Sequence, residues 1–227
     1  MRDTVTQQRN RPDRSRWLMG CFCLLIAAAM GGCPTAYFLV DPEKSETVKA
    51  DYGKIGDRKV AVLVWADRST LDEYPRARRQ VCRAVTYQMK KHLPKARFVS
   101  PREVAKLQND SSRDWQSMSN QELGKQLKSE LLLRIDLLEF TPRASGTREL
   151  RKARVAATVN LYECRDDASL DAVYETEVHI TYPTDSLHAA ADMDESDLLH
   201  EAVDRFAEAT TRKFYDHQIK LQGRRGW

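Results

Sequence analysis

The sequence lacks the glycine-rich motifs that identify common enzyme classes. It contains no G-x-x-x-x-G-K-[ST] loop and no G-x-G-x-x-G turn behind an apolar run, the two motifs that cradle nucleotide phosphates. The G-x-S-x-G turn, which carries the nucleophile of α/β-hydrolases, is also missing. These absences exclude the familiar nucleotide-binding and serine-hydrolase sites, and we expect no bound cofactor.

Metal-binding patterns are incomplete as well. The segment His200-Glu201-Ala202-Val203-Asp204 begins like a zinc-protease helix, but Asp204 occupies the position of the second imidazole ligand. His179 stands between polar strand residues and is expected on a solvated face. His217 is expected at the carboxyl end of a helix, where the helix dipole favours a cation. The sequence therefore predicts no metal site.

The chain also lacks a large excess of one charge. The formal net charge is +4, and five arginines of the first 16 residues supply most of it. From residue 33 onward there are 32 basic and 31 acidic residues. This balance argues against a dedicated nucleic-acid-binding protein. A basic helix face over residues 76–95 favours nucleic acid, and export from the cytosol would argue against that interpretation.

One feature that the sequence does contain is an apolar segment, residues 17–30, behind the five arginines and ahead of Met30-Gly31-Gly32-Cys33. A positive start, a short apolar run and small residues before a cut are typical of a secretory signal peptide. The cysteine directly after the small residues resembles the lipobox of bacterial lipoproteins. That resemblance implies removal of residues 1–32 and acylation of Cys33 with palmitate-type chains.

An uncleaved anchor is the alternative interpretation. The uncharged stretch continues over residues 17–40, which is long enough to span a bilayer once. Gly31, Gly32 and Pro34 interrupt it, and such breakers suit an exposed cleavage site better than a membrane helix. Both interpretations place the following domain on the periplasmic or outer side, because the arginines stay inside. Whether the inner or the outer membrane receives the anchor stays open.

The remaining chain predicts one mixed α/β domain over residues 57–217. Residues 33–56 are expected to be the lipidated cysteine and a tether, and residues 218–227 a polar tail. The expected order is β-α-β-α-α-β-β-β-α: one mixed sheet with helices packed against it. Strands are expected at 59–65, 96–99, 131–140, 153–162 and 172–182, and the last three should form an antiparallel meander. Helices are expected at 75–93, from 101, at 120–128 and at 194–217.

The two turns of this meander have opposite charges. The first turn carries Arg143, Arg148, Arg151 and Lys152, and the second, residues 163–171, is acidic. We expect the basic turn to contact a protein partner or anionic headgroups, with ordinary loop solvation as the alternative. Cys82 and Cys164 are the cysteines of the domain. Each is expected to be a small buried side chain, although a disulfide between them stays open.

Four stretches carry a family resemblance: KVAVLVW, SELLLRIDLLEF, ARVAATVNLYECRD and DAVYETEVHITY. With the lipobox-like start, they resemble envelope lipoproteins with a compact α/β domain. The domain is similar to the amino-terminal domain of the Tol-system propeller protein, to the curli-secretion lipoprotein and to the penicillin-binding-protein activator lipoproteins. Such domains act as scaffolds or assembly partners, and the resemblance implies no enzyme.

The sequence thus predicts a non-enzymatic lipoprotein of the cell envelope, anchored in the membrane through Cys33 and facing the periplasm. Its domain is expected to bind another envelope protein or copies of itself. Two alternatives remain at this point: a signal-anchored protein of the same topology, and an envelope hydrolase with an unrecognised site.

Overall fold

The computed structural model describes residues 45–110, 112, 114–142, 152–165, 168–184 and 193–220. Residues 46–219 form one compact unit. The elements are, in chain order, β1 (Ser45–Val48), β2 (Lys59–Trp65), α2 (Arg68–Glu73), α3 (Ala77–His92), β3 (Arg97–Phe98), α4 (Pro101–Gln108), α5 (Asn120–Leu127), β4 (Leu131–Thr141), β5 (Ala153–Glu163), β6 (Tyr174–Tyr182), α6 (Glu195–Arg212) and β7 (His217–Lys220).

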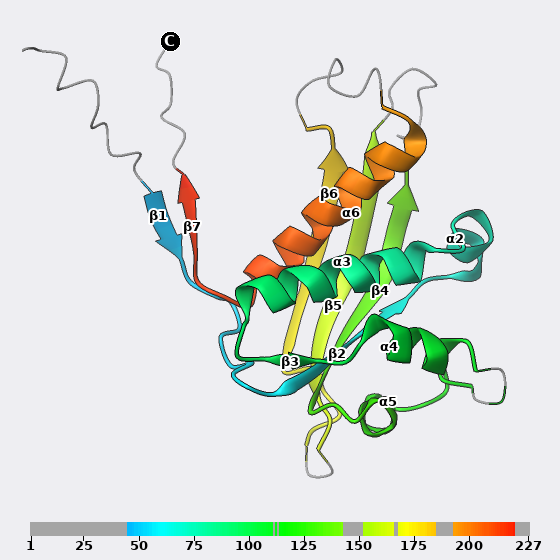
Figure 1. Ribbon diagram of the computed structural model, residues 1–227, viewed down its shortest axis with the longest axis vertical. Helices are drawn as coiled ribbons and strands as arrows, with labels where there is room; N and C mark the ends of the chain where they lie inside the picture. The colour runs from blue at the N-terminus through cyan, green and yellow to red at the C-terminus, as the bar shows by residue number, and fades with distance from the viewer. Residues whose placement is uncertain are drawn as a thin grey trace, which may run out of the picture. The chain divides into compact units, whose positions relative to one another are not determined.

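The main sheet has five strands in the order β3-β2-β4-β5-β6. Strand β2 runs parallel to β3 and β4, whereas β4, β5 and β6 are antiparallel neighbours. Helices α3 and α6 lie side by side against one face of this sheet (Figure 1). The predicted mixed α/β fold and its antiparallel meander are confirmed. Strands β1 and β7 form a separate two-stranded sheet.

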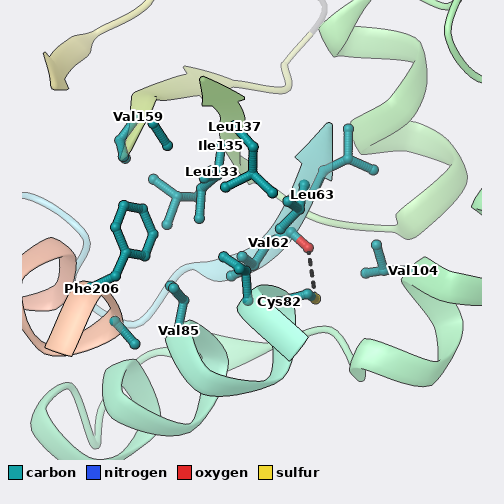
Figure 2. Packing of buried hydrophobic residues seen from close by; sticks show 14 of the residues in the cluster. Val62, Leu63, Cys82, Val85, Val104, Leu133, Ile135, Leu137, Val159 and Phe206 are labelled. Atoms are coloured by element: carbon teal, nitrogen blue, oxygen red, sulfur yellow. Dashed lines mark hydrogen bonds between the residues drawn. The ribbon is translucent and has the colours of Figure 1, made fainter. Parts of the chain in front are cut away.

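The core lies between this face and the two helices. On β5 the alternate residues Ala153, Val155, Ala157, Val159 and Leu161 are all fully buried, as the alternation in the sequence predicts. Figure 2 shows Val159, Leu133 and Ile135 of the sheet close to Phe206 of α6. Burial of each such side chain stabilises the fold by about 1.5–3 kcal/mol, so this layer dominates folding.

The free edge of β2 is closed by helices. Strand β3 pairs with β2 only as far as Val60, so the carbonyl groups beyond it need other partners. The Cys82 thiol of α3 donates to the Val62 carbonyl oxygen at 3.2 Å (Figure 2), and Nε2 of Gln108 in α4 donates to the Val64 carbonyl oxygen at 2.8 Å. These two contacts hold α3 and α4 next to each other beside the sheet.

Three local expectations were wrong or incomplete. The predicted turn after β2 contains the short helix α2, capped by Asp67, whose carboxylate accepts from the Thr70 backbone N–H at 2.6 Å. Helix α6 ends at Arg212, and His217 begins strand β7. His217 therefore does not occupy a helix terminus. Residues 45–56, predicted as part of a tether, include β1 and the buried Ile55.

The membrane-anchor predictions concern residues 1–44, which lie outside the described part. Among the described helices, none combines the length and the apolar composition needed to cross a bilayer.

Candidate functional site

A basic surface on α3 and α4 is the strongest candidate site. Residues 74–102 contain no aspartate or glutamate, but they include nine lysines and arginines: Arg76, Arg78, Arg79, Arg83, Lys90, Lys91, Lys95, Arg97 and Arg102. Helix α3 buries its opposite face, including Val81, Val85 and Met89, against the sheet. Its cationic side chains are therefore held outward by the same periodicity that builds the core.

A groove between α3 and α4 gathers five of these outward cations. We define the basic groove by Arg76, Arg79 and Arg83 of the α3 side and Arg102 and Lys106 of α4. Its volume is about 840 Å³, which lies in the range of ligand sites. All five side chains are exposed, and no acidic residue among the described ones lines the groove. The site therefore has a concave shape and a positive potential.

Among the described residues, the groove cations lack ion pairs, whereas several other cations of the surface have them. Arg97 pairs with Glu130 at 3.2 Å, and Arg205 pairs with Glu201 at 2.9 Å. By contrast, within the part of the chain that the structure describes, none of the five groove cations forms an ion pair. Like charges held this close without counter-charges repel one another, and an anionic ligand would relieve that repulsion.

A second groove extends the site along α3 toward α6. It has a volume of about 560 Å³ and shares Gln80, Arg83 and Pro101 with the basic groove. Tyr87, which is 67% exposed, and Lys90 line it on the α3 side. On the α6 side, Nε2 of His200 lies 3.7 Å from Oδ2 of Asp204, so an imidazole and a carboxylate lie side by side at this end.

Most of the sequence-predicted site residues cannot be placed. Cys33, Arg143, Arg148 and Arg151 lie outside the described residues. Lys152 is described: it is half-buried and directly precedes β5. The structure therefore does not test the predicted basic turn of the meander.

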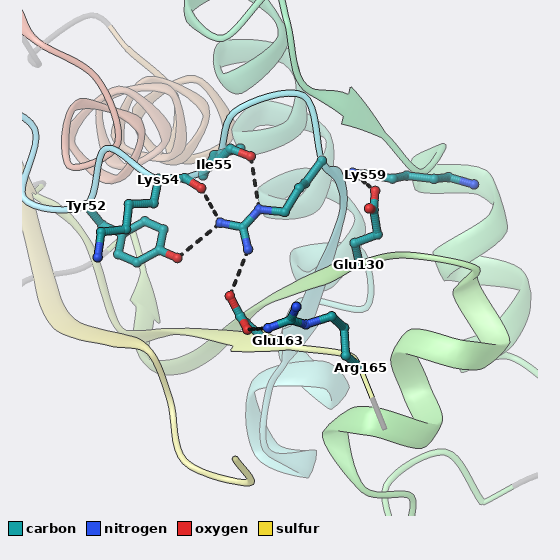
Figure 3. A network of polar contacts seen from close by, with 8 residues as sticks. Tyr52, Lys54, Ile55, Lys59, Glu130, Glu163 and Arg165 are labelled. Atoms are coloured by element: carbon teal, nitrogen blue, oxygen red, sulfur yellow. Dashed lines mark hydrogen bonds and ion pairs between the residues drawn. The ribbon is translucent and has the colours of Figure 1, made fainter. Parts of the chain in front are cut away.

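The acidic turn has a structural role at its first residue. Glu163 accepts from Nη1 of Arg58 at 2.8 Å and from Nη2 of Arg165 at 2.8 Å (Figure 3). Arg58 also donates to the Tyr52 hydroxyl at 3.2 Å and to the Ile55 carbonyl oxygen at 3.2 Å. The hydrogen bond from Arg58 is the main cause that lowers the pKa of Glu163. This carboxylate ties the end of β5 to the segment that enters β2.

His179, a candidate from the sequence, and Asp67, at the carboxyl end of β2, both have local explanations. Nε2 of the exposed His179 lies 3.1 Å from Oε2 of Glu177, as expected for a solvated strand face. Asp67 caps α2, and its hydrogen bonds with Thr70 lower its pKa. No group of three side chains suited to hold a metal ion occurs among the residues that the structure describes.

Both cysteines of the domain are buried and unbridged. Burial raises the pKa of the Cys82 thiol to about 11 and that of the Cys164 thiol to about 11. Since the thiolate is the nucleophile, neither side chain is activated for covalent chemistry near neutral pH. The interpretation of each as a small buried side chain is confirmed.

Comparisons with known proteins show a partial likeness of fold. No known protein family matches the chain, and neither does any curated protein. Among solved structures, it is similar to the PelC dodecamer of Paraburkholderia phytofirmans, with 10% identity, 75% of this chain and 97% of that chain covered, and a TM-score of 0.43. It is also similar to the protein CT253 of Chlamydia trachomatis, with 14% identity, 69% and 96% covered, and a TM-score of 0.41.

A third similar structure is the lipoprotein GNA1162 of Neisseria meningitidis, with 13% identity, 65% of this chain and 94% of that chain covered, and a TM-score of 0.39. The similar structures thus include a bacterial lipoprotein. The specific resemblance to Tol-system and curli proteins stays a prediction. Identities and TM-scores this low assign no function to the chain.

Sequence reasoning found only half of the basic groove. The cationic face of α3 is visible from its helical spacing, but Arg102 and Lys106 belong to another helix that the fold brings alongside. The absence of acidic residues over positions 74–102 is the sequence signal that could have revealed the combined surface.

Proposed function

We propose that this chain is a lipid-anchored protein of the bacterial cell envelope, and that its α/β domain is a non-enzymatic module that binds another envelope component. The acylated Cys33 would hold the domain at the membrane, on the periplasmic side. The domain would recognise its partner through charge and shape. The observation that carries the binding part of this proposal is the basic groove, whose five exposed cations form no ion pair with the residues that the structure describes.

The sequence before the domain supports the anchor. Five arginines, an apolar run and two glycines precede Cys33 in the order that a lipoprotein signal requires. The connection from the anchor to the domain is also short. Eleven residues separate Cys33 from Ser45, and a chain of that length spans at most about 40 Å when fully extended. An acylated Cys33 would therefore keep the domain close to the bilayer.

The chemistry of the described domain supports binding over catalysis. Its two thiols have raised pKa values, Asp67 caps α2, and Glu163 joins the end of β5 to Arg58. The basic groove offers arginine and lysine donors, which bind carboxylates and phosphates. Among the described residues, no carboxylate and no histidine lines the groove, so it offers no side-chain pair for general acid–base catalysis.

Metabolic labelling tests the anchor. Cells that express the wild type or Cys33→Ser are grown with an alkynyl palmitate, and membranes and soluble fractions are analysed. We expect label and membrane retention in the wild type, a mature chain that begins at Cys33, and loss of the label in Cys33→Ser. An intact, unlabelled chain in the soluble fraction would contradict the proposal.

Crosslinking tests the binding role. The wild type and a charge-reversed Arg79→Glu/Arg83→Glu variant are crosslinked in intact cells and purified from membranes. We expect a defined crosslinked envelope component, lipid or protein, with the wild type and its loss with the variant. Equal recovery of the same partner by both proteins would show that the groove is not the binding surface.

A further inference from the structure

We infer that the basic groove and the adjoining cations of α3 form a docking surface for the phosphate headgroups of an anionic bilayer. The surface consists of the five groove cations and of Lys90 and Lys91, which follow on the same helix. This inference deepens the proposed function, and it rests on that proposal because an anchor at Cys33 is what would bring the domain to the bilayer.

The charge of the surface is the first argument. The groove cations, Lys90 and Lys91 are exposed, and within the described residues none of these seven side chains forms an ion pair. Clusters of this size attract anionic lipid surfaces, and each cation near the surface adds to the binding. Other cations of the domain, such as Arg58 and Arg205, are already paired with carboxylates.

The residue types form the second argument. Four of the five groove cations are arginines, and the planar guanidinium group binds a phosphate with two parallel hydrogen bonds. Arg76, Arg79 and Arg83 approach from α3, whereas Arg102 and Lys106 approach from α4. A headgroup that enters between the two helices can therefore meet donors on both sides.

The charges around the groove determine which side of the domain faces the bilayer. On α6, Asp204 lies at the far end of the second groove. The helix carries five carboxylates, Glu195, Asp197, Glu201, Asp204 and Glu208, against Arg205 and Arg212. This net negative charge disfavours a bilayer that lies flat across α6. The contact is instead confined to the α3–α4 side, where Tyr87 presents an exposed ring of the kind that settles at headgroup depth.

Proximity is the third argument. The eleven residues between Cys33 and Ser45 limit the distance from the acylated end to the domain to about 40 Å. Lipid phosphates are then present at a high effective concentration, so even a weak headgroup site is occupied. The acyl chain and the basic surface together form the two-signal arrangement that fixes a peripheral protein in a defined orientation.

A depth measurement tests this docking. The mature, acylated protein carrying Tyr87→Cys is labelled with an environment-sensitive fluorophore and reconstituted into vesicles that contain a nitroxide quencher lipid. The buried Cys82 and Cys164 thiols stay unlabelled because burial raises the pKa of both. A second protein carries the label at Glu175→Cys on β6, at the opposite edge of the sheet from β3.

We expect quenching at position 87 in phosphatidylglycerol vesicles, little quenching in pure phosphatidylcholine vesicles, and little at position 175 in either. High salt should remove the effect, since it screens the charges. Reversal of Arg76, Arg79 and Arg83 to glutamate should lower the ratio of docked to undocked protein by about 100-fold or more. The matched control reverses the exposed Lys54, Arg205 and Arg212, which changes the net charge equally, and should dock as the wild type does.

Several outcomes would overturn the inference. One is equal quenching at position 87 in both kinds of vesicle. Another is an equal loss of docking in the groove variant and in its control. A third is release of the docked protein from the vesicles by an acidic peptide but not by soluble glycerol phosphate. The last result would assign the groove to a protein partner. Circular dichroism of each variant verifies its folding. Mass spectrometry of Cys33 in the same preparation reports the anchor separately: an acylated chain that fails to dock refutes the surface alone, whereas an unacylated chain refutes the proposed anchor.

Discussion

Gly124 lies where helix α5 touches the end of β5, and the contact leaves no room for a side chain. A Cβ atom added at Gly124 would come within 2.2 Å of Cys164 Sγ and 2.3 Å of Cys164 Cβ. We therefore expect Gly124→Ala to destabilise the domain by about 1–3 kcal/mol, although alanine favours a helix interior. Thermal unfolding measures the loss. In a double-mutant cycle, Cys164→Gly should restore part of it, and simple additivity of the two changes would contradict the packing argument.

The Arg58–Glu163 contact gives the domain a pH-dependent element of stability. The pKa of Glu163 is lowered, chiefly by the hydrogen bond from Arg58. The stabilisation is therefore fully present above the unfolded-state pKa of about 4.3 and disappears as the pH falls through the lower folded-state value. We expect Glu163→Gln to cost about 1–3 kcal/mol at pH 7. Urea unfolding from pH 7 down to acid should show the two proteins converge, and a gap that persists in acid would refute this role.

At the scale of elements, one side chain of α4 donates a hydrogen bond to the part of the β2 edge that β3 does not reach. Gln108 donates to the Val64 carbonyl oxygen at 2.8 Å, at a position where β3 no longer pairs. We expect Gln108→Ala to destabilise the domain by about 1–2 kcal/mol, because the carbonyl loses its donor. The control is Gln88→Ala on α3, because that amide makes no hydrogen bond among the described residues. Chemical denaturation compares them, and an equal effect of the two changes would show that the edge contact contributes little.

The elements that sequence predicted well are those with a buried face. Apolar residues that follow the period of a strand or a helix predict strands β2, β4, β5 and β6 and helices α3 and α6. Helix α2 has six residues and none of them is buried, so no periodic pattern marks it. Strands β1 and β7 have four residues each and pair across most of the chain. Such pairing depends on tertiary structure, and local sequence cannot specify it.

At the scale of the whole molecule, the first and last parts of the folded unit are joined by a few exposed contacts. Asp216 accepts from the Ala50 backbone N–H at 2.9 Å and from Nζ of Lys49 at 2.7 Å. The Tyr52 backbone N–H donates to the Lys213 carbonyl oxygen at 3.0 Å. None of these contacts lies in the main core, so their loss should open this region locally without unfolding the sheet.

Hydrogen exchange tests that separation. We expect Asp216→Ala to speed exchange of the Ala50 amide and its neighbours, while amides of β4 and β5 keep the wild-type rate. Asp171→Ala, which removes an exposed carboxylate of the β5–β6 turn, is the control. Faster exchange throughout the main sheet would show that the contact supports global stability instead.

The candidate site shows which features cannot be predicted from neighbouring residues in the sequence. Acylation of Cys33 can be proposed from residues that are adjacent in the chain, because the motif is local. The basic groove is different, since Arg83 and Arg102 meet only after β3 has reversed the chain and α4 has packed beside β2. Equally, Glu163 looked like part of a free acidic turn, although Arg58 lies more than 100 residues earlier and binds it. Charge pairing is a property of the folded surface.

A count of free thiols in the mature protein tests both the processing at Cys33 and the burial of the domain cysteines. The sequence has five cysteines, and removal of residues 1–32 with acylation of Cys33 would leave only Cys82 and Cys164 as free thiols. Both are buried with a raised pKa, so we expect an aromatic disulfide reagent to react slowly with the native protein and to release two equivalents after unfolding. A Cys82→Ala control should release one. Five equivalents would reveal an unprocessed chain, and none without prior reduction would reveal a disulfide between Cys82 and Cys164. Either count contradicts the processed, unbridged protein that the anchor and the core together predict.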